Sequence, residues 1–338
     1  MRTGSVPVSE IAKLPYVKRV PTDGRIVFLL PYYDADANDW VLNVPVAKDQ
    51  LGRLAGGEPV VSSYLATRPA NPNTDFPFIL GTFVAQHLSF KGVADALSRL
   101  EGDVYQFCAV LEKYRLISEH ARKHHVVESL YASELEYLVI LIRSVYDLLQ
   151  MLSKHAAALV HTLEEPRRRL IVNLPDRFSK IVLHGDELRT ADEITKTFGL
   201  PGPLAQFYEA ESARFQILRD LRVSIEHHGE TVGTIFRFEE GAAVSTTDPP
   251  WSSFKIWKPE QLQKNNLGSL RLLFAHLVSE ALAMTTRYAA AYASCVAVPG
   301  ALSDGIYLYL RHPFSHHLMS LDRILQEPWE QTLTEGQE

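Results

Sequence analysis

The spacing of apolar residues changes near residue 86, and this change constrains the fold more than any other feature of the chain. Before it, short β-branched runs such as 25–30 and 40–46 are separated by turn-forming residues, which predicts strands. After it, apolar residues recur at three- and four-residue steps over 103–122 and 128–162, which predicts long amphipathic helices. The chain therefore combines a small α+β portion with a larger helical one.

The rest of the chain continues this pattern. Residues 204–228, 267–295 and 314–325 show helical spacing, whereas 231–238 and 253–257 have the composition of strands that flank a long loop. The predicted fold is mainly α and α+β overall: an antiparallel helical bundle with an inserted β-hairpin and a small N-terminal α+β portion.

Domain boundaries follow from the same changes in texture. We expect an N-terminal α+β region over 1–100, with a linker rich in Pro and Asn at 68–75. A helical domain follows over 101–330, with the hairpin inserted at about 231–257. The polar tail 331–338 is expected to be disordered.

Charge and composition exclude some classes of function. The 338 residues carry a formal charge of −6, which argues against a protein that grips long nucleic acid through many phosphates. A local basic cleft remains compatible with this sum, because steering depends on where the charges lie.

Motifs for cofactors and membranes are missing from the sequence. It has no Walker loop, GxSxG elbow or dinucleotide glycine fingerprint, and we predict no cofactor. No run reaches the roughly 18 apolar residues of a membrane span. Cys108 and Cys295 lie inside apolar helical patterns, so each is expected to be a buried thiol in a reducing cytoplasm.

An arginine and a histidine, Arg222 and His227, end the most polar stretch of the predicted helix 204–228. Five residues at 3.6 per turn place them about 140° apart on an ideal helix. They converge only if the last turn opens near Gly229 or if a second subunit supplies one of them. At the helix C-terminus the dipole favours a protonated imidazole, so the two groups suit metal-free phosphodiester chemistry.

The motif Arg222-x4-His227, followed by His228 and Gly229, resembles the Arg-x(4–6)-His motif of HEPN domains (higher eukaryotes and prokaryotes nucleotide-binding). Residues 141–149 look like an early core helix of that fold, and the resemblance covers roughly 128–295. It implies a helical bundle that often forms a homodimer with the Arg and His of both subunits in one cleft.

The resemblance implies RNA or nucleotide as the ligand. Many such proteins are metal-independent endoribonucleases of toxin or defence systems, in which a partner protein can neutralise the toxin. Others are non-catalytic interaction or scaffold modules, and this alternative is favoured by Val223, which stands where the enzymes usually have a polar residue. In the same alternative Arg222 forms an ordinary helical ion pair with Glu226 at i+4.

Further residues complete the predicted site. The catalytic pair is Arg222 and His227, and the supporting residues are His228, Glu226, Arg219, Arg143 and Asp147. The predicted phosphate contacts are Arg167, Arg168, Arg169, Arg177 and Lys180. His312 and His316 have a spacing that suits two metal ligands, but no third ligand is evident nearby, and we predict no metal site.

Overall fold

The computed structural model describes residues 6–47, 49–121, 127–163, 174–228 and 233–329, and for 224–228 the helical backbone alone. About 51% of the chain is helical and about 18% is in strands, so the predicted mixed α+β class is confirmed. The antiparallel arrangement of the helices as one bundle stays a prediction.

The chain forms two compact units, each assembled from three stretches of sequence. The first unit contains Met1–Gly102, Tyr146–Ala213 and Met284–His316. The second contains Asp103–Val145, Arg214–Ala283 and His317–Glu338. The predicted N-terminal region 1–100 is therefore accompanied in its unit by two later parts of the chain.

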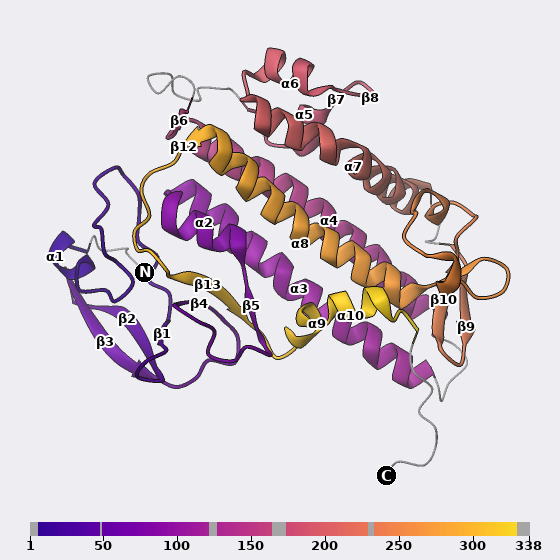
Figure 1. The fold of residues 1–338 in the computed structure, drawn as a ribbon, viewed down its shortest axis with the longest axis horizontal. Coiled ribbons are helices and arrows are strands. Elements are labelled where there is room, and N and C mark those ends of the chain that lie inside the picture. Colours follow the sequence, from indigo (N-terminus) through magenta and orange to yellow (C-terminus); the bar gives the residue numbers. More distant parts are fainter. Residues whose placement is uncertain (1–5, 48, 122–126, 164–173, 229–232, 330–338) are drawn as a thin grey trace, which may run out of the picture. The chain divides into compact units, whose positions relative to one another are not determined.

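The first unit holds a six-stranded sheet of order β3-β2-β1-β4-β13-β5 (Figure 1). Its strands are β1 (Tyr32–Asp34), β2 (Asp39–Ala47), β3 (Gln50–Gly56), β4 (Ser62–Ala66), β5 (Asp75–Pro77) and β13 (Tyr307–Arg311). Only the neighbours β1 and β4 are parallel. Because β13 lies between β4 and β5, residues from near the end of the chain complete a sheet of the N-terminal region.

The predicted strand 25–30 is wrong, whereas the one at 40–46 is confirmed within β2. Residues 25–30 bond to scattered partners instead of a ladder: the amide of Ile26 donates to Ser89, and the carbonyl of Phe28 accepts from the Tyr16 hydroxyl. A β-branched composition alone does not supply the neighbouring strand that a ladder needs. The residues Tyr32–Asp34, which lie between the two predicted strands, form β1 instead.

The long predicted helices are confirmed, with boundaries that move by a few residues, except that the helix predicted from residue 103 already begins at Lys91. They are α3 (Lys91–Ala121), α4 (Glu128–Ala157), α7 (Gly202–His228) and α8 (Leu270–Cys295). The final predicted helix is divided into α9 (His316–Met319) and α10 (Leu321–Gln326). The remaining α-helices described are α1 (Val8–Ile11), α2 (Ile79–His87), α5 (Phe178–Val182) and α6 (Ala191–Phe198), and two short 3-10 helices span Trp251–Ser253 and Pro259–Gln261. The tail 331–338 lies outside the described residues.

A hairpin does follow α7, but its second strand was predicted in the wrong place. Strands β9 (Ile235–Phe238) and β10 (Gly241–Ser245) pair across a two-residue turn, and β11 (Leu267–Ser269) adds to β10. Gly241, the first residue of β10, has a φ of 126°, a conformation that favours glycine. Residues 253–257 belong to no strand. Two-residue strands form the small pairs β6 (His161–Thr162) with β12 (Val296–Ala297) and β7 (Leu183–His184) with β8 (Glu187–Leu188).

A buried ion pair ties β13 to β5. Arg311 stands directly opposite Asp75 in the antiparallel register, and its Nε and Nη2 donate to the two carboxylate oxygens at 2.8 and 2.9 Å. Asp75 also accepts from the Tyr64 hydroxyl at 2.7 Å, and burial followed by this hydrogen bond raises the pKa of Tyr64. The guanidinium lies 4.9 Å from the Trp40 ring centroid. The segment 68–75 is thus anchored at its end rather than a free linker.

We predict that Arg311→Leu lowers the free energy of unfolding by about 3–5 kcal/mol, because the Asp75 carboxylate would stay buried without its cation. Urea unfolding monitored by tryptophan fluorescence measures the change. Lys13→Ala is the matched control, since Lys13 is 70% exposed in its ion pair with Glu10 and should change stability by less than about 1 kcal/mol. Equal losses in the two variants would contradict the assigned role of Arg311.

Candidate functional site

A hollow of about 460 Å³ lies in the first unit between α2 and the end of the six-stranded sheet. Its walls are mostly apolar and aromatic, and no Lys, Arg, Asp or Glu is among the described residues that line it. The lining residues are Pro77, Phe78, Ile79, Thr82, Phe83, Gln86, His87, Tyr307 and Tyr309.

Local periodicity explains which side chains reach the hollow. In α2 the residues Ile79, Phe83, Gln86 and His87 recur at helical spacing and share one face. Tyr307 and Tyr309 are two apart in β13 and therefore share one face of the sheet. Helix and strand form the two walls.

A glycine allows α2 to approach β13 closely. A Cβ atom on Gly81 would lie 2.6 Å from Cδ1 of Phe78 and 3.0 Å from Cδ2 of Leu308, both closer than normal packing permits. The amide of Phe78 donates to the carbonyl of Leu308, and the amide of Leu308 donates to Oγ1 of Thr82 at 2.8 Å. These contacts fix the distance between the two walls.

Two polar groups of the lining are occupied by the framework. Thr82 Oγ1 also donates to the carbonyl of Phe78 at 3.1 Å. Gln86 uses both ends of its amide, since Oε1 accepts from the amide of Ser303 at 2.8 Å and Nε2 donates to the carbonyl of Ile306 at 3.4 Å. These side chains hold the walls together rather than offering groups to a ligand.

His87 differs from these two groups. Its Nδ1 lies 2.8 Å from the carbonyl oxygen of Pro299, and because a carbonyl only accepts, Nδ1 carries the proton. In the neutral ring Nε2 then has a free lone pair. The ring also packs against Phe83, with centroids 5.6 Å apart. His87 is therefore a half-buried acceptor with a fixed orientation in an apolar wall.

The predicted catalytic pair lies near the end of α7. The helix is regular through His228, and Arg222 is half-buried on it, with Arg219 one turn earlier donating to Gln216 at 3.4 Å. The side chains of Glu226, His227 and His228 lie outside the described residues. Whether Arg222 and His227 converge stays a prediction.

Arg143 and Asp147 both make structural contacts. Arg143 is 8% exposed, and its guanidinium lies 4.1 Å from the ring centroid of Phe215 on α7, in the second unit. In the first unit, Oδ1 of Asp147 accepts from the amide of Phe178 at 2.9 Å, which fixes the start of α5. Both contacts are typical of packing and capping roles.

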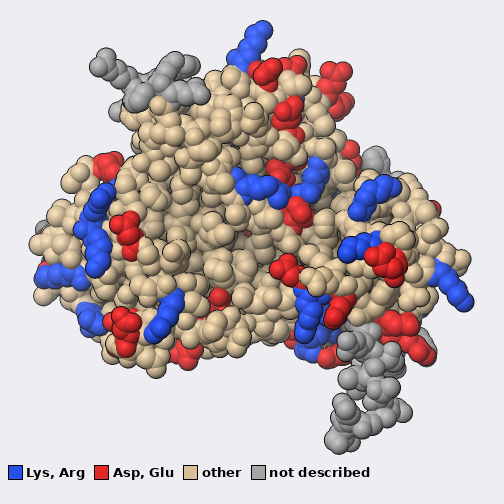
Figure 2. Space-filling view, in the orientation of Figure 1, with Lys and Arg blue, Asp and Glu red and all other residues tan. Residues whose placement is uncertain are grey.

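The predicted phosphate contacts are only partly described. Arg167, Arg168 and Arg169 lie outside the described residues, whereas Arg177 and Lys180 are exposed at α5. On the face shown in Figure 2, basic and acidic side chains are interspersed, and neither sign gathers over a broad area. The described part of that face therefore adds no support for a large RNA-binding surface.

His312 and His316 each contact a backbone atom two or three residues away in the sequence. Nδ1 of His312 accepts from the amide of Phe314 at 3.2 Å, and burial lowers the pKa of His312. Nδ1 of His316 lies 3.3 Å from the carbonyl of Pro313. The pairing of His312 with His316 as metal ligands stays untested.

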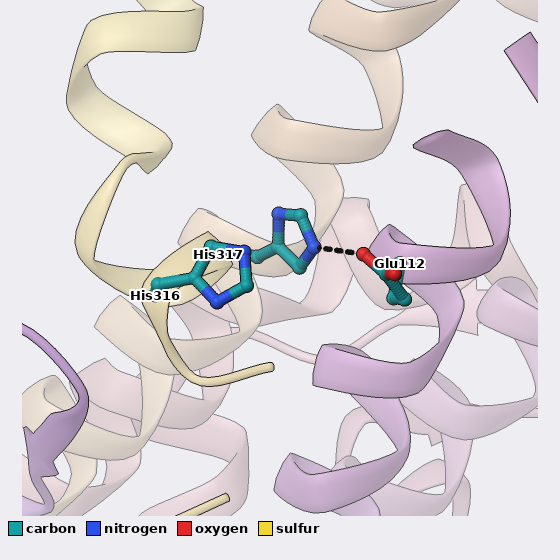
Figure 3. A group of neighbouring side chains, drawn as sticks. All are labelled: Glu112, His316 and His317. Carbon is teal, nitrogen blue, oxygen red and sulfur yellow. Dashed lines mark hydrogen bonds and ion pairs between the residues drawn. The ribbon is translucent and has the colours of Figure 1, made fainter. Parts of the chain in front are cut away.

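His317, in the second unit, points its ring at Glu112 of α3, and Nε2 lies 2.7 Å from the carboxylate (Figure 3). Arg115 donates two further hydrogen bonds to this carboxylate, at 2.9 and 2.7 Å. Arg115 therefore already balances the charge of this carboxylate. We interpret the three residues as an ion-pair cluster.

Two glutamates of α3 have pKa values shifted in opposite directions. Neither shift was predicted from the sequence. Burial raises the pKa of Glu101, whose main polar contact is Ser63, from 4.5 to about 7. The hydrogen bonds from Arg115, aided by the one from His317, outweigh burial and hold the pKa of Glu112 at about 2. Glu101 does not line the hollow, so its pKa bears on stability.

We predict that Glu101→Gln stabilises the protein at pH 8 by roughly 2–3 kcal/mol and has little effect at pH 4. A raised folded pKa means that the unfolded chain releases its proton first, so stability falls as the pH rises from about 4.5 to 7. Urea unfolding at both pH values measures this difference.

Glu112→Gln is the matched comparison. Its low folded pKa contributes stability above pH 4.5 that is lost as the pH falls toward 2, so this variant should be destabilised at pH 8. A gain in stability from Glu101→Gln that is equal at pH 4 and pH 8 would refute the burial argument.

Among the described residues, no helix is long and apolar enough to cross a membrane. Both cysteines are buried. Comparison with known proteins adds nothing to the site: no family model, curated protein or solved structure matches the chain.

Proposed function

We propose that this protein binds a small, mainly apolar molecule in the hollow between α2 and β13. The observation that carries the proposal is the hollow itself: about 460 Å³, with aromatic walls and one oriented histidine. Binding sites for small molecules typically have 300–1,000 Å³, apolar linings and a few well-placed polar groups.

The walls favour binding because they are fixed before a ligand arrives. Gly81 brings α2 against Phe78 and Leu308, while Tyr309 stacks on Tyr64 with centroids 5.5 Å apart. A ligand that enters such a site pays little for ordering side chains. Each 100 Å² of apolar surface that it buries contributes roughly 2.5 kcal/mol before the cost of association.

Filling the hollow should abolish binding. We predict that Ile79→Trp weakens binding of the neutral dye Nile red at least about tenfold, since the indole would occupy the space that the ligand uses. Dye fluorescence during titration with protein gives the dissociation constant.

Leu54→Trp is the matched control, because Leu54 is 48% exposed on β3 and lies outside the hollow, whereas Ile79 is 54% exposed and lines it. Circular dichroism must show that both variants are folded. The proposal fails if Nile red does not bind the parent protein, or if the two tryptophan variants bind it equally well.

A second proposal concerns α7: a HEPN-like bundle that binds RNA or nucleotide as a homodimer and cleaves RNA without metal. Its support is that Arg219 and Arg222 lie one turn apart on a helix that stays regular through His228. In this mechanism the 2′-hydroxyl attacks the adjacent phosphate, and the bond from phosphorus to the 5′-oxygen breaks to leave a 2′,3′-cyclic phosphate. Arg222 stabilises the phosphorane charge, and His227 transfers the proton to the leaving 5′-oxygen. A non-catalytic interaction module is the alternative.

We predict for this second proposal that the protein, in EDTA, cleaves RNA to 2′,3′-cyclic phosphate ends and that His227→Ala abolishes cleavage. A mixed pool of structured and unstructured RNAs is the substrate, and gel analysis of end-labelled products is the measurement. His184→Ala, which changes an exposed histidine of β7, is the matched control and should leave cleavage intact. Absence of cleavage by the folded parent protein would contradict the ribonuclease proposal and favour the non-catalytic interaction module.

A further inference from the structure

We infer that the ligand of the hollow is an uncharged aromatic compound that donates a hydrogen bond to Nε2 of His87, as a phenol does. This inference rests on the proposed binding function and names the chemical class of the ligand.

The aromatic part of the inference follows from the walls. Phe78 and Phe83 come from one side, and Tyr307 and Tyr309 from the other, so a flat ring can make edge or face contacts with each. Such pairs contribute beyond the burial of area alone, which favours an aromatic ligand over an aliphatic one of equal size.

The absence of charge in the ligand follows from the lining. None of its described residues is Lys, Arg, Asp or Glu, so a bound ion would lose its water without gaining a partner of opposite charge. Arg25 approaches the same region, but its Nη1 donates to the carbonyls of Gln86 and Gly300, and its Nε donates to Asp23. That guanidinium is engaged by the framework.

The donor in the ligand follows from His87. Thr82 and Gln86 are occupied by backbone groups, whereas the Nδ1 proton of His87 is held by Pro299 and directs the lone pair to Nε2. A ligand hydroxyl satisfies this acceptor. The corresponding methyl ether has no proton to donate. Nε2 would then lose its contact with water without gaining a hydrogen bond, and this weakens binding of the ether.

The test compares three probes that share the 4-propylphenyl group: 4-propylphenol, its methyl ether and 4-propylbenzoate. Isothermal titration measures their dissociation constants with the parent protein and with His87→Leu and His87→Gln. We expect the phenol to bind about tenfold more tightly than the ether, the benzoate to bind more weakly than both, and His87→Leu to remove the preference for the phenol. His87→Gln, whose amide oxygen can accept, should restore part of it.

The comparison of phenol with ether in the parent protein needs no variant, so it remains valid even if His87→Leu fails to fold. Equal affinities for the two probes, or preferential binding of the benzoate, would overturn the inference while Nile red binding blocked by Ile79→Trp still supports the hollow as a binding site. Failure of all probes and of Nile red would instead remove the proposed function.

Discussion

The ion pair between Arg311 and Asp75 joins β13, from the last stretch of sequence in the first unit, to β5, from the first stretch. The two residues are 236 positions apart, yet they face each other across β13 and β5 and are both nearly inaccessible to solvent. A charge in that position is tolerated only with its partner, since desolvating one alone costs several kcal/mol. The pair therefore favours the observed register of β13. A shift of one residue would separate the two charges and leave each without its partner.

The hollow depends on that register. Tyr307 and Tyr309 share one face of β13 with Arg311, so a shift of one residue in this register would turn both tyrosines away from the hollow. On the other wall, α2 is held to the same strand by the bonds of Phe78 and Thr82 to Leu308. The proposed ligand site is thus a consequence of how the sheet closes. Substitutions in the ion pair should affect binding as well as stability.

Helices could be predicted from the sequence to the extent that their signals are local. Apolar spacing over ten or more residues was enough for α3, α4, α7 and α8. Strands were harder, because 25–30 has a strand-like composition and no neighbour, whereas 307–311 has both and was not predicted. The segment 68–75 resembled a linker, since nothing local indicates that Asp75 will meet an arginine from the far end of the chain.

The same contrast separates the two candidate sites. Arg222 and His227 were found because they lie five residues apart, and a short motif is visible in any sequence that contains it. His87 has no such motif: its orientation comes from Pro299, and its aromatic neighbours include two tyrosines from β13. A binding site built from residues distant in sequence becomes visible only once the sheet that joins them is known. The proposed role of His87 therefore depends on tertiary contacts, since its acceptor nitrogen is defined by the carbonyl of Pro299, which no spacing rule connects to it.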